Sequence, residues 1–480
     1  MAQMGRRSGL RRQYDLFCVR NQIVPVRKQR ILLVSYHFPP SAAVGGQRIA
    51  NFARFLPAYG WEPHILTIAD KDIERLDPAR VLGLAEVEIY KAGVCPTPVS
   101  VWVAAKRFAR RFFSAQRMRE DEDRLVIGVK GGQEREHLTR RLKRYLLSLL
   151  VLPDLQNGWI PTATFMAWRK VRRYRYDWVV TSCPPYSAHL IGLAVKYLTG
   201  GRWAADFRDP WMTADPKVLL PMSALSNRIE SWLERKVVEE SDLVVFNVER
   251  LRDAYRQRYA HVAEHKFICI PNGVSPFGPT EVRKNTSKYE VFTLSYTGAL
   301  YVGRSPEPIF RAVSNLILSR KVKADEICIK LVGQCRMIDG VPTSLMIEKY
   351  GLEHVVEVHD PVSQAEALEI IHRSHLALLF APKLAFQIPA KVYDYFSTGT
   401  RILAIADDGA TADLIRQTGS GFTFAPDDIS GIAECICEER AGRAPISATD
   451  PTVLARFEAR SLTGELVGHL DRIAGASGNQ

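Results

Sequence analysis

Two doubly wound α/β domains, each built on a parallel sheet, are the fold class that this sequence predicts. Short apolar runs alternate with helical patterns along the chain, and a stretch rich in proline, glycine and polar residues interrupts them near residue 271. Apolar strands that do not alternate with polar residues are typical of a parallel sheet covered by helices on both faces. A chain of 480 residues, 46% of them hydrophobic, is long enough for two cores. In such sheets a ligand binds at the carboxyl ends of the strands.

The elements of the first domain follow from local patterns. Residues 1–29 are basic and contain no apolar run, so we expect a disordered extension and no secretory signal. The apolar run at 30–35 predicts the first strand. A helix is predicted after it, because apolar residues recur at helical spacing before Gly60, namely at Ile49, Phe52, Ala53 and Leu56. Further strands are predicted at 63–68, 178–182, 202–207 and 242–247.

The second domain begins after the interruption. Residues 271–290, PNGVSPFGPTEVRKNTSKYE, have the composition of a linker. Five apolar runs then predict five strands: FTLSYTGAL, ICIKLVG, VVEVHD, LALLFA and RILAIA. We therefore place the first domain at 30–275, the linker at 276–290 and the second domain at 291–450, followed by a last helix at 455–475.

Charge is divided unevenly along the chain. Residues 1–289 hold 47 Lys and Arg against 28 Asp and Glu, a net +19, whereas residues 290–480 hold 18 against 24, a net −6. An anionic partner would therefore meet the first half, and an anionic membrane surface fits this pattern. No nucleic acid is expected, because the sequence has no zinc-ligand array and no aromatic RNA-binding motif. The eight cysteines form no CxxC pair, which indicates reduced thiols in a cytoplasmic protein.

Glycines and charged residues follow two strands of the first domain. Gly45 and Gly46 lie between the first strand and its helix, where glycine lets backbone amides approach a ligand and a helix N-terminus attracts anions. An ordinary loop pair is the alternative. Asp206, Arg208 and Asp209 follow a predicted buried strand, where charges need partners. We expect Arg208 and Asp209 to line the cleft as catalytic residues, with a structural Arg–Asp pair as the alternative.

A helix predicted at 389–398 carries the candidates of the second domain. Pro389 suits a first helical position, and Gly399 ends the helix. Lys391 and Asp394 are three residues apart and therefore share a face. They either bind a ligand or form an exposed ion pair.

Five blocks in order resemble the family 4 (group 1) glycosyltransferases of GT-B fold. The blocks are ILLVSYHFPPSAAVGGQRIANFARFLPAYGWEPHILT, then IPNGV, then SYTGAL with IKLVG, then KVYDYFSTGTRILAI, and last ARSLTGELVGHLDRI. The resemblance covers nearly everything from 30 to 475 and is weakest at 95–160. It implies two Rossmann-like domains that face each other across a cleft, with the last helix crossing back onto the first domain.

The resemblance also implies an activity. It implies a glycosyltransferase that moves a sugar from a nucleoside-diphosphate sugar to an acceptor hydroxyl, with retention of configuration and with no metal and no bound cofactor. The first domain would bind a glycan or lipid-linked acceptor, and the second would bind the donor. Gly45 and Gly46 would lie near the donor phosphates and the acceptor.

The family pattern assigns donor-binding roles in the second domain. Gly298 and Arg304 follow the first strand of that domain, and the fork of an arginine suits a diphosphate. Lys391 resembles the lysine of a Pro-x-Lys variant. Asp394 occupies the second of two positions at which many members carry glutamate, and its counterpart there binds ribose hydroxyls.

Two departures from the family pattern leave other functions open. Arg208 stands where many members carry a histidine, and Phe386 stands at the first glutamate position. A non-catalytic GT-B scaffold or regulatory subunit is one alternative. A sugar-nucleotide epimerase of similar fold is another.

Two basic and apolar segments favour a membrane. In 101–117, apolar residues fall on one side of a helical wheel and basic residues on the other, and 140–153 is a second such segment. We expect peripheral association with the inner face of the plasma membrane, in the synthesis of a cell-envelope polysaccharide or glycolipid. A core-packed helix with a basic outer face is the alternative. The acidic triplet at 121–123 and the glycine-rich run at 128–133 are not expected to bind a metal or a phosphate.

Overall fold

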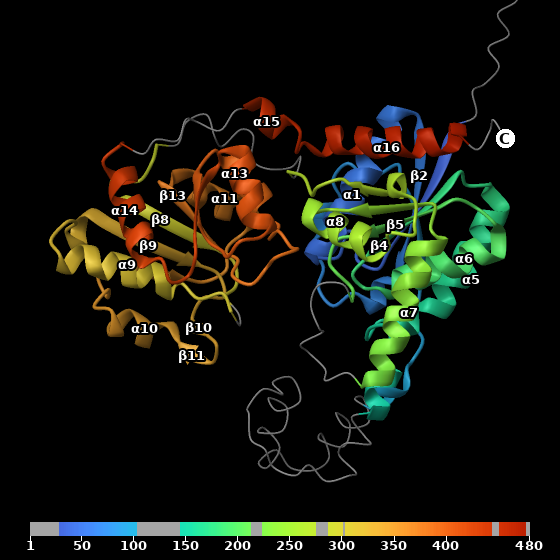
Figure 1. Ribbon diagram of the computed structural model, residues 1–480, viewed down its shortest axis with the longest axis horizontal. Coiled ribbons are helices and arrows are strands. Elements are labelled where there is room, and N and C mark those ends of the chain that lie inside the picture. Colours follow the sequence, from blue (N-terminus) through green and yellow to red (C-terminus); the bar gives the residue numbers. More distant parts are fainter. Residues whose placement is uncertain are drawn as a thin grey trace, which may run out of the picture.

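Two α/β domains lie side by side in the computed structural model (Figure 1). The structure describes residues 28–102, 145–212, 223–274, 287–300, 303–443 and 451–476. Three segments considered from the sequence lie almost entirely outside these residues. They are 101–117, which was expected to bind a membrane, and 121–123 and 128–133, which were not expected to bind a metal or a phosphate.

A parallel sheet of seven strands forms the centre of the described part of the first domain, in the order β3-β2-β1-β4-β5-β6-β7. β1 and β4 are apolar and buried along most of their length, as expected for strands covered on both faces. The sheet order reverses direction between β1 and β4, which creates a crevice at their carboxyl ends. The strands are β1 (Gln29–Ser35), β2 (Trp61–Ile68), β3 (Glu88–Ala92), β4 (Trp178–Cys183), β5 (Trp203–Phe207), β6 (Leu243–Phe246) and β7 (Phe267–Cys269).

Helices cover both faces of this sheet and bury a separate cluster on each. One cluster includes Leu32, Val179 and Trp203, and the opposite cluster includes Leu33, Val180 and Ala204. Neighbouring residues of a strand thus point to opposite faces. The helices of the domain are α1 (Gln47–Phe55), α5 (Ile160–Tyr174), α6 (Ser187–Thr199), α7 (Ala224–Glu240) and α8 (Glu249–Arg258), and residues 145–150 are also helical.

The second domain repeats this arrangement on a parallel sheet ordered β12-β9-β8-β13-β14-β15. Its strands are β8 (Phe292–Thr297), β9 (Ile327–Val332), β12 (Val356–His359), β13 (Leu376–Phe380), β14 (Arg401–Ile405) and β15 (Gly421–Phe424), and a hairpin of β10 (Met337–Ile338) and β11 (Val341–Pro342) lies apart. Its helices are α9 (Glu307–Leu318), α10 (Thr343–Lys349), α11 (Gln364–Arg373), α12 (Lys391–Thr398), α13 (Ala410–Thr418), α14 (Ile429–Arg440) and α15 (Pro451–Ala455).

Short 3-10 turns connect several of these elements. They are Val44–Gly46, Leu56–Tyr59, Asp70–Asp72, Pro78–Val81, Asn157–Trp159, Glu264–Lys266 and Ala324–Glu326. The turn at Val44–Gly46 matters most here, because it leads directly into α1.

The last helix, α16 (Ala459–Ala476), packs on the first domain beside α1 (Figure 1). Leu462, Leu466 and Leu470 join the core cluster that contains Ile49 and Phe52. The other connection between the domains runs alongside: the amide of Val274 donates to the carbonyl oxygen of Phe457 over 2.8 Å. The expected linker at 276–290 lies mostly outside the described residues.

The fold class expected from the sequence, two doubly wound parallel-sheet domains, is confirmed. Several strand boundaries shift by one or two residues, and the start of α12 also differs. α12 begins at Lys391 rather than at Pro389, because the amides of Val392 and Tyr393 bond to carbonyl oxygens only three residues back and make a tighter turn. Gly399 ends the helix with a φ of 68°, as its position predicted.

Candidate active site

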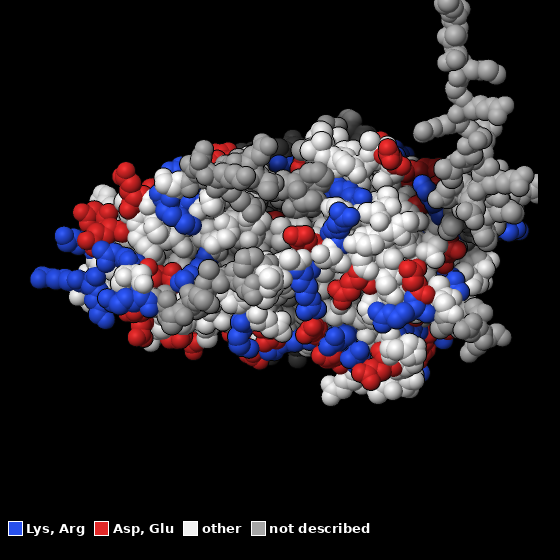
Figure 2. Space-filling model, turned by 90° about the horizontal axis from the view of Figure 1, so that it is seen from above, with Lys and Arg blue, Asp and Glu red and all other residues white. Residues whose placement is uncertain are grey.

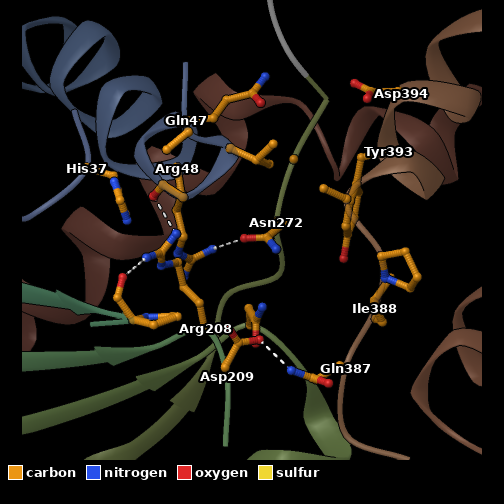
Figure 3. Close-up of a pocket in the computed structure, with 18 of the residues that line it drawn as sticks. His37, Gln47, Arg48, Arg208, Asp209, Asn272, Gln387, Ile388, Tyr393 and Asp394 are labelled. Atoms are coloured by element: carbon orange, nitrogen blue, oxygen red, sulfur yellow. Dashed lines mark hydrogen bonds between the residues drawn. The ribbon is translucent and has the colours of Figure 1, made fainter. Parts of the chain in front are cut away.

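A cavity of about 410 Å³ lies between the two domains (Figure 3). Its lining comes from the segments that follow β1, β4, β5, β6 and β7 and from the start of α1 in the first domain, and from Arg304 and the chain around α12 in the second. The cavity is therefore at the carboxyl ends of the strands, where doubly wound sheets bind ligands.

The glycine pair before α1 is tightly packed. A Cβ on Gly45 would lie 3.0 Å from Nη1 of Arg208, and a Cβ on Gly46 would lie 2.9 Å from the carbonyl oxygen of His37. Gly45 lines the cavity, whereas Gly46 is buried behind it. Of the two glycines proposed from the sequence, only Gly45 is thus in direct reach of a ligand in the cavity.

Arg208 joins three loops at the edge of the cavity. Its guanidinium donates to the carbonyl oxygens of Cys183 over 2.8 Å, of Pro184 over 2.6 Å, and of Gly45. Burial is the main cause that lowers the pKa of Arg208. The guanidinium lines the cavity, but among the described residues it donates to backbone carbonyl oxygens, a structural role that the sequence did not indicate.

Asp209 reaches across the cavity to the second domain. Its Oδ1 accepts a hydrogen bond of 2.8 Å from Nε2 of Gln387 (Figure 3). Phe386, at the position where the family pattern has a glutamate, packs instead against the core of the first domain. The polar side chain that this loop presents to the cavity is therefore Gln387, one residue further along.

A buried ion pair beside the cavity was missed from the sequence. Arg48 and Asp206 are 3.0 Å apart and are 6% and 1% exposed. Arg48 also donates to the carbonyl oxygen of Pro271 over 2.8 Å, and Ser182 donates to Asp206 over 2.7 Å. Asp206 thus pairs with α1 and not with Arg208. Its partners satisfy the charge that burial would otherwise make costly.

His37 lies on the same wall, close to Arg208 (Figure 3). Burial and, after it, the positive charge of Arg208 lower the pKa of this imidazole. The ring is therefore neutral at physiological pH, and a neutral imidazole can accept a proton and can donate or accept a hydrogen bond.

Two buried carboxylates on α7 hold the loop that carries Arg208 and Asp209. Glu234 accepts from the amide of Met212 over 2.6 Å and from the hydroxyl of Tyr255 over 2.8 Å. Glu230 accepts from Nε1 of Trp211 over 3.1 Å. Both glutamates are 0% exposed, so the loop after β5 is fixed from below by charge-assisted hydrogen bonds.

On the opposite wall, the side chain of Lys391 turns towards β8. Its Nζ donates to the hydroxyl of Tyr296 over 2.8 Å and lies 4.1 Å from the centre of that ring. A Cβ on Gly298, where φ is 128°, would lie 2.0 Å from the same Nζ. Gly298 therefore makes room for the lysine. Among the described residues, Lys391 and Asp394 form no ion pair with each other. The alternative that they are an exposed ion pair is therefore wrong.

The charges in this wall are incompletely compensated. Burial, with the nearby charge of Arg304, lowers the pKa of Lys391 to about 8. Burial also raises the pKa of Asp394 to about 6. Arg304 and Asp394 line the cavity with Pro389 and Ala390 at the start of α12, whereas Lys391 and Gly298 lie just behind that lining. An anion here would meet two cationic side chains and a helix N-terminus.

Sequence reasoning missed several lining residues, among them His37, Arg48, Asn272 and Gln387. Arg48 could have been found from the sequence, because it is a charged residue on the mostly apolar buried face of α1. In the structure its guanidinium lies over the ring of Phe52 at 5.0 Å. The others depend on how the two domains meet, which local patterns do not contain.

The sequence of the first domain matches a known family. Residues 115–276, about a third of the chain, match the model of Glycosyltransferase Family 4. The match places this region among the sequences that resemble that family. The family match and the fold together indicate that the protein is a glycosyltransferase. A search of curated proteins found no match.

Solved structures of low sequence identity share the two-domain fold of this chain. The Anabaena protein HepE in complex with UDP superposes with a TM-score of 0.57 at 13% identity, over 92% of this chain and 100% of that one. Sucrose-phosphate synthase from Thermosynechococcus elongatus gives 0.55 at 14% identity over 94% and 100%. A glycosyltransferase from Rickettsia africae gives 0.54 at 12% identity over 93% and 99%.

The surface adds two observations. None of the described helices is long and apolar enough to cross a membrane. On the face shown in Figure 2, Lys and Arg side chains are interspersed with Asp and Glu.

Proposed function

We propose that this protein is a retaining glycosyltransferase that moves a sugar from a nucleoside-diphosphate sugar to an acceptor hydroxyl of a cell-envelope polysaccharide or glycolipid. The observation that carries the proposal is the division of the cavity. One wall holds the half-buried cations Arg304 and Lys391 beside the start of α12, and the other holds the polar loop that carries Arg208 and Asp209. HepE, which shares the fold, was solved with UDP and with UDP and glucose, which makes a uridine nucleotide the first donor to test.

The wall around α12 suits a diphosphate. Arg304 and Lys391 supply positive charge, and the positive end of the dipole of α12 also favours an anion. A diphosphate would also restore the charge on Lys391, whose pKa is lowered by burial and by Arg304. Asp394 lies in the same wall and can accept hydrogen bonds from ribose hydroxyls.

In the proposed transfer, the bond between the anomeric carbon and the diphosphate oxygen breaks, and its electron pair stays with the diphosphate. The acceptor oxygen bonds to the anomeric carbon on the same face, and its proton passes to the departing phosphate oxygen. The protein needs to stabilise the leaving group and position the acceptor, and it needs no nucleophile of its own. Asp209 and His37, opposite α12, are placed to orient the acceptor hydroxyl.

Thermal unfolding in the presence of single nucleotide sugars tests the donor. A donor at a hundred times its dissociation constant should stabilise the protein by roughly 2.7 kcal/mol. Product analysis with and without an acceptor then separates the classes: transfer requires the acceptor, whereas an epimerase converts the donor alone. Nuclear magnetic resonance of the product gives its anomeric configuration, and an inverted product would contradict the retaining assignment.

A non-catalytic scaffold is the second candidate. It is favoured by Phe386, which packs into the first domain where the family pattern has a glutamate, and by Arg208, which bonds to three backbone carbonyls. Nucleotide binding without turnover on any acceptor would support this alternative. Turnover that Asp394→Asn reduces would exclude it.

We also propose that the first domain docks on an anionic membrane. α7 extends beyond the sheet (Figure 1), and its outer face exposes Leu225 and Trp232 beside Arg228. Aromatic and basic side chains together are typical of helices at a membrane surface. Co-sedimentation with phosphatidylglycerol vesicles at low salt tests the proposal. Trp232→Ala should weaken binding to the vesicles. Tyr197→Ala should not, although Tyr197 is a similarly exposed aromatic residue on α6. Equal loss in both, or no co-sedimentation of the wild type, would contradict it.

A further inference from the structure

Two buried polar atoms from opposite domains have no hydrogen-bond partner. They are Oδ1 of Asn247, which follows β6, and the hydroxyl of Tyr393, on α12. The two residues are only 4% and 2% exposed. Orphaned polar atoms at this depth are rare, because leaving them unpaired costs free energy.

Both residues stand at one place in the cavity. A smaller pocket of about 60 Å³ adjoins the main one, and the residues that line both are Asn247, Tyr393 and Ile388. Asn247 and Tyr393 therefore both lie at the junction of the two spaces. Tyr393 is next to the chain segment that carries Asn272 (Figure 3).

Other polar groups of this region are already paired. Asn272 accepts from Arg48, and Gln387 donates to Asp209. Arg208 is bound by three carbonyl oxygens. Eight buried polar side-chain atoms have no partner among the described residues, and only those of Asn247 and Tyr393 belong to residues that line the cavity. Unpaired atoms in a cavity lining are expected where a ligand supplies the missing partners.

We propose that Asn247 and Tyr393 form a subsite that binds a hydroxyl group of a carbohydrate. A hydroxyl donates to the carboxamide oxygen of Asn247 and accepts from the phenol of Tyr393, and so satisfies both. A phosphate or carboxylate has no proton for the carboxamide oxygen and is served by Arg304 and Lys391 on the other wall. The inference rests on the proposed function and adds a specificity site to it, because the hydroxyl belongs either to the donor sugar or to the acceptor.

Tyr393→Phe is the decisive variant, because it removes only the unpaired oxygen. Without ligand, the variant should unfold at the same temperature as the wild type or higher, since an unsatisfied buried group is lost. With ligand, the affinity for the sugar should fall about fivefold to tenfold. Tyr395→Phe is the matched control on the same helix: its hydroxyl donates to the carbonyl oxygen of Leu378 over 3.1 Å, so it should lower the unfolding temperature and leave ligand affinity unchanged.

Calorimetric titration of the full chain distinguishes the sources of the hydroxyl. The probes are UDP, UDP-glucose, GDP, GDP-mannose, and methyl glucoside added in the presence of saturating nucleotide. If Tyr393→Phe lowers the affinity for the nucleotide sugar alone, the hydroxyl belongs to the donor. If the variant lowers the affinity for methyl glucoside alone, the hydroxyl belongs to the acceptor.

A second variant tests whether one hydroxyl bridges both residues. Asn247→Leu keeps the side-chain size and removes the polar atoms. If a single hydroxyl contacts both, the double variant with Tyr393→Phe should lose less affinity than the product of the two single losses.

The outcomes separate the inference from the proposed function. If the wild type binds the nucleotide sugars but Tyr393→Phe and Asn247→Leu leave every affinity within twofold, the subsite is wrong and the donor site stands. If Tyr393→Phe lowers the unfolding temperature as Tyr395→Phe does, the hydroxyl is structural and the inference is also overturned. If the wild type binds none of the nucleotides, the proposed function fails and the inference fails with it.

Discussion

The pKa of Lys391 gives a prediction in which binding and stability change in opposite directions. Burial places the pKa near 8, and the described structure pairs the ammonium with the hydroxyl of Tyr296 rather than with a carboxylate. If a diphosphate binds only the protonated form, the competent fraction is about nine tenths at pH 7 and about one tenth at pH 9. Nucleotide affinity should therefore fall roughly tenfold over this range, equivalent to about 1.4 kcal/mol.

The stability of the free protein should move the other way. Between pH 8 and 10.5 the unfolded chain keeps the proton of Lys391, whereas the folded chain releases it, so the free energy of unfolding rises with pH in this window. Lys391→Met removes both effects. The variant should be more stable than the wild type at pH 7, by up to roughly 3 kcal/mol, and should bind nucleotide more weakly with little pH dependence.

Titration calorimetry of UDP at pH 7, 8 and 9, together with urea unfolding at the same pH values, measures both quantities. Lys349→Met is the control, because Lys349 is an exposed lysine on α10, paired with Glu307 and outside the cavity. Unchanged affinity in Lys391→Met, with the same pH profile as the wild type, would refute the assignment of this lysine to the phosphates.

Three further predictions follow from packing and charge. Gly46→Ala should lower the free energy of unfolding by about 1–3 kcal/mol, because its Cβ would meet backbone, whereas Gly45→Ala meets only the end of an arginine and should cost less in urea unfolding. Arg208→Ala should cost about 3–5 kcal/mol by the same measurement, since three carbonyl oxygens lose their donor; an unchanged midpoint would contradict the clamp. The raised pKa of Asp394 should make the free energy of unfolding fall as the pH rises from about 4 to 6, because the folded state binds an extra proton in this range. Asp394→Asn should abolish this fall. The same dependence of stability on pH in the variant as in the wild type would argue against that pKa.

The fold was predictable because its signals are local. β1 and β4 are short apolar runs, and the helix α1 shows its buried face in the spacing of Ile49, Phe52 and Ala53. Such patterns depend on neighbours in the sequence, and therefore they survive without knowledge of the tertiary structure.

The site was predictable only where it follows a strand or begins a helix. Gly45, Asp209 and Asp394 line the cavity as their positions indicated. The partners of these residues were not predictable, because they come from elsewhere in the chain. Asp209 pairs with Gln387, which is 178 residues away in the sequence and in the other domain. Charge position alone likewise did not reveal that the guanidinium of Arg208 bonds to backbone.

The crossing of α16 sets an order of events during synthesis of the chain. Leu462, Leu466 and Leu470 complete the cluster in which Ile31 and Ile49 are buried, yet they are made last. While the ribosome is still producing the second domain, the first lacks the leucines of α16 that pack beside α1 in this cluster. The strands of the second domain are contiguous in sequence, although Phe457 of the C-terminal segment also packs in its core. The first domain is therefore synthesised first but completes its core last. A nascent chain stalled before residue 459 should depend on chaperones to shield α1.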